Sequence, residues 1–578
     1  MTSDASAVTA PTHESIKETI ESIVVALILA FIFRAFVVEA FVIPTGSMAP
    51  TLYGAHGMIV CQDCGTEFSY GLRDLGDTRR SSHVDSRAQA ICPNCLAVNT
   101  DLKINDQKKN PETGDRILVL KWPFEIGVES LKPARWDVTV FKDPSDGTTN
   151  FIKRLVGLPN EVVAIIDGDF FTVPTSELSD KTMKEIEQQR HEKFLLRTNQ
   201  RDKYLLQTGR PAGVLRKLPR FVMDELDAKM TIARKTSEAQ QALWFLVYDH
   251  DYPPRTLDRG QPQWKAGGGE DSGWDTSTRR VRFVDKGRKD DYIELAGRQI
   301  RASNAYNISV RRSRQLPPFV GDQRVRFVLT PGSAQGSVEI RLHKLGRTFV
   351  ASIDMNGKVS ITESDIRNRK SKPVDLEAQL PNFAVGESVE VSFQNVDYRL
   401  TLRIGGVEVL ASSSERDRPG YYGPVLSKLR RKPGRGRNFP SAPRLYAAGG
   451  DFDFTHLVVE RDAYYYHQSG HSALPDLQWA PKSGWASAEN PLLLRGHEYF
   501  MLGDNTSASK DSRLWNRWGS HLVARAEEFQ LGTVPEDQLI GKAFFVYWPS
   551  PNRIEWLDWM PILKGSVVPD VGRMRWIR

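Results

Sequence analysis

The segment from Ile20 to Ile43 constrains this chain most, because it is apolar over almost its whole length. The residues that interrupt it are Glu21, Ser22, Arg34 and Glu39. A spanning helix needs ~20 apolar residues, so a span here must extend past Arg34, whose side chain would reach the membrane interface. We interpret residues 20–40 as a retained transmembrane anchor behind a cytoplasmic tail, 1–19. A cleavable signal peptide is the alternative, but the tail is acidic and no small-residue cleavage site follows.

The length of 578 residues predicts more than one folded unit, since single hydrophobic cores stop growing near ~250–300 residues. The net charge of +7 arises from 78 basic and 71 acidic residues. This small excess is compatible with anionic lipid but does not indicate a specific partner, and we expect no nucleic-acid ligand.

A serine directly after the apolar segment is the first candidate for chemistry. Ser47 follows Gly46 in the sequence FVIPTGSMAPTL, with Pro44 and Pro50 on either side. Glycine frees the backbone and proline restricts it, so the segment can hold Ser47 exposed on a stiff turn. Taken alone, a Gly-Ser between prolines is more often an ordinary loop.

A lysine within an apolar strand is the second candidate. Residues 135–142 and 150–159 alternate as two strands of a hairpin, and Lys153 lies among Phe151, Ile152 and Leu155. Burial would lower the pKa of this lysine toward a range in which the neutral amine accepts a proton. The alternative is an edge lysine that reaches solvent.

These segments, together with GDRILVLK at 114–121 and GDNTSASKDSR at 503–513, resemble the conserved boxes of type I signal peptidases. Each box is modest alone, and their order behind an apolar segment carries the resemblance. It covers roughly 20–60, 112–173 and 497–550. Self-cleaving repressors also use a Ser/Lys dyad, but they lack this apolar segment and this set of boxes.

The resemblance implies a catalytic mechanism that needs no cofactor. Ser47 would attack the scissile carbonyl and Lys153 would act as general base. The oxyanion hole would come from the Ser47 backbone N–H and the Thr45 hydroxyl. Ser509 would orient the lysine. The polar residues that support the wall of the site beside the lysine would be Asp504, Asp511 and Arg513.

The resemblance also implies the substrate and the location. The partners would be exported preproteins with signal peptides cut after small-x-small sites, and membrane lipid. The residues expected to line the apolar substrate pockets are Ile43, Pro44, Met48, Leu52, Phe151 and Ile152. The enzyme would cross the cytoplasmic (inner) membrane once, with its N-terminus cytoplasmic and its catalytic domain outside.

All four cysteines lie in two CxxC pairs between the Ser47 segment and the next box. Cys61 and Cys64 form the first pair, and Cys92 and Cys95 the second. Two such knuckles are typical of a zinc ribbon with a closed, structural tetrahedral site. Disulfides within or across the pairs are the alternative in an oxidising compartment.

A long insertion separates the lysine hairpin from the 503–513 box. Its first part, 174–290, predicts helices and a linker, and 291–490 predicts short alternating strands typical of a β-sandwich. We expect a spacer or docking module, with a carbohydrate ligand as the alternative.

The predicted fold is therefore mainly β, with a transmembrane helix, a signal-peptidase β-fold domain, a zinc-ribbon-like module and a β-sandwich-like domain. The catalytic domain would comprise 41–58, 112–173 and 491–578, and the cysteine module 59–111. A rival function is a catalytically inactive, membrane-tethered binding protein whose sandwich recognises a ligand.

Overall fold

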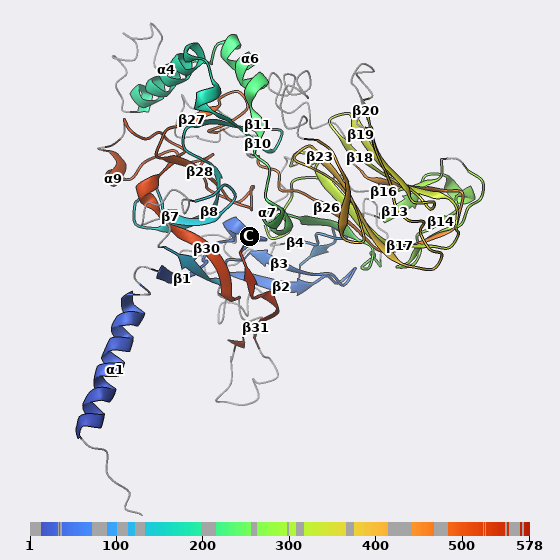
Figure 1. Cartoon of the computed structure of the whole chain (residues 1–578), viewed down its shortest axis with the longest axis horizontal. Helices are drawn as coiled ribbons and strands as arrows, with labels where there is room; N and C mark the ends of the chain where they lie inside the picture. Colours follow the sequence, from blue (N-terminus) through green and yellow to red (C-terminus); the bar gives the residue numbers. More distant parts are fainter. Residues whose placement is uncertain are drawn as a thin grey trace, which may run out of the picture.

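The computed structural model is mainly β (Figure 1). It describes residues 13–32, 34, 37–71, 89–100, 114–121, 133–197, 215–255, 263–288, 290–296, 300–307, 317–365, 375–413, 442–466, 484–523, 525, 527–549, 552–553, 567–568 and 571–577.

The N-terminal helix α1 (His13–Ile32) extends away from the rest of the molecule, at the lower left of Figure 1. Its exposed large apolar side chains are Ile20, Ile23, Val24, Val25, Leu27, Ile28, Leu29 and Phe31. In the described part of the chain, however, no helix combines the length and the apolarity needed to cross a membrane. Strand β1 (Val38–Val42) follows, so residues 38–40, which the sequence assigned to the anchor, belong to a sheet. The β-branched and aromatic residues of this segment favour the pleated sheet.

A large antiparallel sheet forms the centre of the molecule. Its strands, in spatial order, are β1, β6 (Arg116–Leu120), β30 (Leu539–Trp548), β7 (Val138–Lys142), β8 (Asn150–Gly157), β28 (Glu498–Leu502) and β29 (Val534–Pro535), and β33 (Arg575–Trp576) pairs with β30. Strands from both halves of the chain thus alternate in one sheet. In particular, β28 pairs with β8 and brings the 503–513 box beside Lys153.

A second, smaller sheet continues from the end of β8. Its order is β11 (Thr231–Ile232), β10 (Asp169–Pro174), β9 (Glu161–Ile166) and β27 (Leu492–Leu494). The helices of this region are α4 (Asp180–Arg197), α6 (Arg220–Lys229), α7 (Ser237–Ala242) and α9 (Ser520–Val523). Three of these helices, α4, α6 and α7, lie within 174–290, for which the sequence predicted helices and a linker, and residues 198–214 of that stretch are outside the described part.

Two facing antiparallel sheets form the β-sandwich at the right of Figure 1. One runs β14 (Trp274–Asp275), β15 (Val281–Phe283), β26 (Phe452–Arg461), β17 (Gln323–Pro331), β22 (Val389–Val396), β23 (Arg399–Ile404) and β24 (Val407–Ala411), with β12 (Phe245–Asp249) paired to β26. The other runs β13 (Gln263–Ala266), β16 (Tyr292–Ala296), β25 (Arg444–Ala448), β18 (Ser337–Lys344), β19 (Arg347–Asp354), β20 (Lys358–Asp365) and β21 (Asp375–Gln379).

The predicted boundary of the sandwich at residue 291 is wrong. Strands β12 to β15 lie before it and pair with sandwich strands, so the stretch read as a linker is part of both sheets. The Gly-rich run that suggested a linker is a turn ending in the short helix η6 (Gly269–Asp271). Alternate residues of β17, β18 and β19 are buried, as expected for strands with one face in a shared core.

A buried ionic contact joins the sandwich to the smaller sheet. The Lys344 ammonium, at the end of β18, lies 2.9 Å from the Asp169 carboxylate of β10 and 2.8 Å from that of Asp322. All three side chains are at most 5% exposed. The Lys344–Asp169 pair therefore holds the two units together. Separating them would leave the buried Asp169 carboxylate without its partner, which would be strongly destabilising.

The remaining elements are short. The cysteine module consists of the hairpins β2 (His56–Val60) with β3 (Glu67–Gly71) and β4 (Ala90–Ile91) with β5 (Val98–Asn99). The others are η2 (Gly46–Met48), η5 (Thr175–Glu177), η10 (Glu536–Gln538), β31 (Asn552–Arg553), β32 (Val567–Val568) and η12 (Val571–Arg573).

Candidate active site

Ser47 lies in η2, a single turn that follows β1. The Ala49 N–H donates to the Gly46 carbonyl at 3.1 Å, and the Leu52 N–H donates to the Met48 carbonyl at 2.9 Å. Ser47 is 8% exposed, so it is more enclosed than an ordinary loop serine. Gly46 has a φ outside the left-handed region, and the turn therefore does not need glycine for its backbone conformation.

Lys153 reaches this turn from β8. Its Nζ atom donates to Ser47 Oγ at 2.7 Å and to the Ile152 carbonyl at 2.8 Å. The side chain is 4% exposed. Burial lowers the pKa of Lys153 to about 8, against the opposing effects of Asp511, Asp504 and Asp143. A substantial fraction of the amine is then neutral near pH 8, which a general base requires.

The acidic residues near Lys153 are paired with arginines instead. Asp504 accepts two hydrogen bonds from Arg154, at 2.9 and 2.7 Å. Asp511 accepts two from Arg513, at 2.8 and 2.7 Å. Within the described residues Lys153 forms no ion pair, so neither carboxylate holds its amine in the charged form.

The structure places Ser509 differently from its predicted role. Its hydroxyl is buried and has no hydrogen-bond partner among the described residues, and the Lys153 amine donates to Ser47 and Ile152 instead. The expected Ser509–Lys153 hydrogen bond is therefore absent from this geometry. Thr45 does lie near Ser47, and its hydroxyl donates to Ser47 Oγ at 3.5 Å.

The predicted apolar pocket residues divide into two groups. Ile43, Met48, Leu52 and Ile152 belong to one buried cluster, in which Met48 and Leu52 have no exposed surface. The prediction that these two line an open pocket is wrong for this structure, because the core of the large sheet closes over them. Pro44 is exposed and Phe151 is partly exposed.

Sequence reasoning missed Arg154, Thr51 and Asn505. Thr51 donates to Asp504 at 2.6 Å, and the Asn505 amide donates to the Gly46 carbonyl at 3.0 Å. A detectable signal existed for Arg154, since it follows Lys153 inside an apolar strand and must be paired if buried. No local pattern distinguishes Asn505 from other polar residues of its loop.

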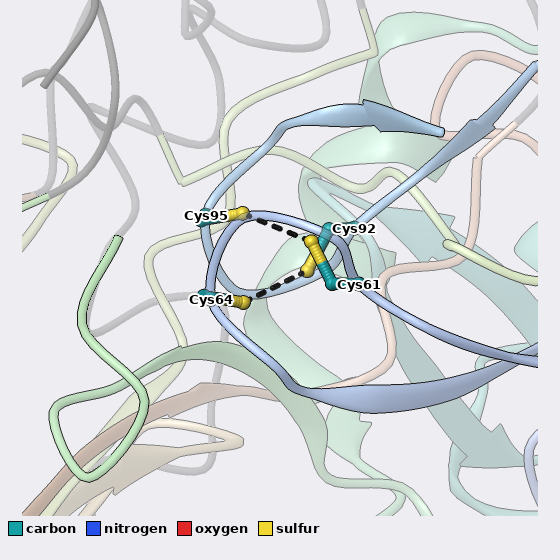
Figure 2. A group of neighbouring side chains, drawn as sticks. All are labelled: Cys61, Cys64, Cys92 and Cys95. Atoms are coloured by element: carbon teal, nitrogen blue, oxygen red, sulfur yellow. Dashed lines mark hydrogen bonds between the residues drawn. The ribbon is translucent and has the colours of Figure 1, made fainter. Parts of the chain in front are cut away.

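The four cysteine sulfurs converge between the two small hairpins (Figure 2). All of them lie within 4.8 Å of one another, and the Cys61–Cys95 and Cys64–Cys92 pairs are 3.5 and 3.6 Å apart. None is bonded to another. Zn–S bonds of ~2.3 Å in a tetrahedron place sulfurs about 3.8 Å apart, so the donor set and its spacing fit a zinc ion.

Each cysteine pair sits in a tight turn. The Gly65 N–H donates to the Cys61 carbonyl at 2.9 Å, and the Leu96 N–H donates to the Cys92 carbonyl at 3.1 Å. Gly65 and Leu96 both have positive φ, of 80° and 63°. The two turns thus repeat one conformation that aims both thiols of a pair to the same point.

Comparison with known families agrees with this arrangement. A family model described as signal peptidase, peptidase S26, matches residues 16–223 and 459–548, which together are just over half of the chain. The chain belongs to the signal peptidase S26 family. The stretch without a match contains the sandwich strands from β12 to β25 and most of β26.

Curated members of the signal peptidase family match about a quarter of this chain. Signal peptidase I of Pseudomonas fluorescens is 34% identical over 137 residues, covering 24% of this chain and 30% of the relative. Signal peptidase I of Buchnera aphidicola subsp. Baizongia pistaciae is 27% identical over 150 residues, covering 26% and 32%. The chain thus spans about a third of the length of these relatives.

Solved structures resemble parts of this chain only weakly. A carbohydrate-binding module of Bacillus subtilis is 10% identical, with a TM-score of 0.21, and covers 34% of this chain and 95% of that one. Galectin LEC-6 of Caenorhabditis elegans is 14% identical, with a TM-score of 0.17, and covers 25% and 86%.

Burial of the Lys153 amine predicts a cost to the stability of the folded chain. Its pKa falls from 10.5 to about 8 on folding, which corresponds to about 3 kcal/mol of destabilisation below pH 8. Between pH 8 and 10.5 the unfolded chain binds more protons, so stability rises with pH in that window. We expect Lys153→Met to raise the free energy of unfolding at pH 7, with the gain shrinking as the pH rises from 8 to 10.5.

Urea denaturation at pH 7 and pH 10.5 measures this difference. Lys142→Met, which alters a more exposed lysine on the neighbouring strand, serves as the control and should change little. A Lys153→Met variant less stable than wild type at pH 7 would contradict the assignment of a desolvated amine.

Proposed function

We propose that this member of the family is a serine endopeptidase that removes N-terminal signal peptides from exported preproteins, with Ser47 as nucleophile and Lys153 as general base. The observation that carries the proposal is the 2.7 Å contact between Lys153 Nζ and Ser47 Oγ in a buried environment. A serine hydroxyl is a weak nucleophile without an adjacent base, and a lysine serves as that base only when its amine is neutral.

In the proposed reaction, the neutral Lys153 amine takes the proton of Ser47 Oγ as this oxygen attacks the scissile carbonyl carbon. The tetrahedral intermediate collapses as its C–N bond breaks, and the leaving amine takes the proton from Lys153. The remaining ester is hydrolysed by water, whose proton Lys153 accepts and then returns to Ser47 Oγ. Lysine thus acts first as base and then as acid in each half-reaction.

The negative oxygen of each intermediate needs hydrogen-bond donors. The Ser47 N–H and the Thr45 hydroxyl are the proposed donors, and Thr45 already lies 3.5 Å from Ser47 Oγ. Loss of one such donor costs ~10²- to 10³-fold in rate.

The proposed substrate is an extended peptide with small residues at −1 and −3. Strand β1 is at the edge of the large sheet, and β-strand addition at such an edge gives affinity independent of sequence. Of the six proposed pocket residues, Pro44 is exposed and Phe151 is partly exposed, so these two can contact substrate side chains. An inactive binding protein is not favoured, since both dyad side chains are present and in contact.

Cleavage of a precursor with an Ala-x-Ala site tests the proposal. In detergent, wild type should cut it, and Ser47→Ala and Lys153→Met should each lose at least ~10⁴-fold in rate. The rate should rise with pH and reach half of its maximum near pH 8, because the neutral amine is the active form. Activity that survives either substitution would overturn the assigned roles.

We also propose that α1 anchors the enzyme in the cytoplasmic membrane, with the N-terminus cytoplasmic and the catalytic domain outside. The support is its exposed apolar surface, for example at Val24, Ile28 and Phe31, on a helix that extends away from the folded body (Figure 1). Apolar area of this extent is unfavourable in water and favourable in lipid.

The double variant Val24→Glu/Ile28→Glu should move the protein from the alkali-resistant membrane pellet to the supernatant, because each buried charge costs ~2.5–3.5 kcal/mol. Thr19→Glu, near the polar start of the helix, is the matched control and should remain in the pellet. Equal extraction of wild type and the double variant would refute anchoring by α1.

A structural zinc ion at Cys61, Cys64, Cys92 and Cys95 is a further proposal, supported by the convergent free sulfurs. The ion would stabilise the two hairpins and take no part in catalysis. Purified wild type should contain one zinc ion per chain, and Cys61→Ser should contain far less, whereas Glu67→Gln in the same module should retain it. Protein free of zinc, with disulfides detected by mass, would exclude this assignment.

A further inference from the structure

A short segment of the sandwich insertion leaves its own domain and lies against the Ser47 turn. Residues 300–307 follow β16, and their base is fixed by hydrogen bonds of 2.9 Å from Ala302 N to Pro318 O and 3.0 Å from Val320 N to Ile300 O. Arg461, the last residue of β26, donates to the Ser303 carbonyl at 2.5 Å. The segment is therefore held by the sandwich while its tip contacts the peptidase.

The tip carries an asparagine that pairs with the Asn505 amide. Asn307 Nδ2 donates to Asn505 Oδ1 at 2.8 Å, and Asn505 Nδ2 donates back to Asn307 Oδ1 at 2.7 Å. The second hydrogen of Asn505 Nδ2 is directed to the Gly46 carbonyl at 3.0 Å, and the Asn505 N–H donates to the Ser47 carbonyl at 3.0 Å. Asn307 thus fixes the orientation of the Asn505 side-chain amide. Asn505 in turn binds the carbonyls of Gly46 and Ser47, which lie on either side of the Ser47 Cα atom.

Tyr306 covers the same turn. A Cβ atom added to Gly46 would overlap the Tyr306 ring, so the glycine provides space for this ring. The Tyr306 hydroxyl donates to the Ala55 carbonyl at 3.2 Å, and its ring stacks on Tyr53 at 5.7 Å. Gly46 is thus needed for contact with a residue about 260 positions away in the sequence.

A third contact fixes the far side of the turn. Asn304 Nδ2 donates to the Ala49 carbonyl at 3.2 Å. Its Oδ1 accepts from the Tyr306 N–H at 3.1 Å, which shapes the tip itself. The carbonyls of Gly46, Ser47 and Ala49 are thereby all held by side chains or backbone from outside the turn, and two of these contacts depend on the sandwich segment.

We propose that the sandwich insertion supplies a positioning element to the catalytic centre, with Asn307 acting through Asn505 and Tyr306 acting on Gly46 to hold Ser47 in reach of Lys153. The expected effect on the reaction rate rests on the proposed function, but the contacts that hold the turn do not depend on it. Misplacement of a nucleophile by ~1 Å costs as much as ~10²-fold in rate, so loss of the brace should be visible kinetically.

Asn307→Leu keeps the branched shape of the side chain and removes its hydrogen bonds to Asn505 and Ser507. We expect kcat to fall about tenfold with KM nearly unchanged, because the peptide-binding edge at β1 is not touched. Asn307→Gln, which retains an amide, should recover part of the loss. Asn356→Leu, in an exposed sandwich turn, is the matched control and should match wild type. A wild-type kcat in Asn307→Leu would overturn the proposal.

A paired substitution tests Tyr306. Gly46→Ala should abolish cleavage, and Gly46→Ala with Tyr306→Ala should restore part of it, because removal of the ring frees the space. Gly46→Ala with Tyr292→Ala, which removes a sandwich tyrosine remote from Ser47, should remain inactive. Absence of any rescue by Tyr306→Ala would contradict the role given to this ring.

Hydrogen exchange separates this inference from the proposed function. In Asn307→Leu, the amides of residues 45–52 should exchange faster than in wild type, while those of β19 and β20 should not change. This readout needs no peptidase activity. If wild type fails to cleave the precursor but the turn exchanges faster in Asn307→Leu, only the proposed function is refuted. If exchange of residues 45–52 is the same in Asn307→Leu and wild type, the positioning role of the sandwich segment is refuted.

Discussion

The buried Lys153 amine is the constraint on which the catalytic centre depends. A lysine at this depth is costly when charged, and a nearby carboxylate would normally keep it charged. Asp504 and Asp511 are close enough to raise its pKa, yet each is engaged by its own arginine, Arg154 or Arg513. Pairing the acids elsewhere leaves burial as the dominant effect, and the amine is available as a base.

The arrangement of the sheet explains how large insertions coexist with this centre. Strands β8 and β28 pair directly although the sandwich lies between them in sequence. The cysteine module and the sandwich both leave and re-enter the peptidase between strands, so the paired backbone of the large sheet remains intact. The sandwich is nevertheless coupled to it, through the buried Lys344 contact and through the segment that ends at Asn307.

Sequence patterns predicted several features because their physical signals are local. Alternating residues marked the strands around Lys153, and the CxxC spacing marked the sulfurs that converge in the structure. Sequence patterns gave wrong predictions where a segment's structure depended on contacts with residues far away in the sequence. The end of the apolar helix was misplaced because β1 is favoured by pairing with β6, and the linker before residue 291 proved to be sandwich strands because β26 pairs with them.

The sequence by itself determined the family, the order of the catalytic boxes and the candidates Ser47 and Lys153, because each depends on residue types within a short window. Only the tertiary structure decided that Met48 and Leu52 are closed off, that Ser509 does not bond the lysine, and that Asn505 and Asn307 hold the turn. Burial and hydrogen-bond partners are set by segments hundreds of residues apart, and no local pattern records which of them meet.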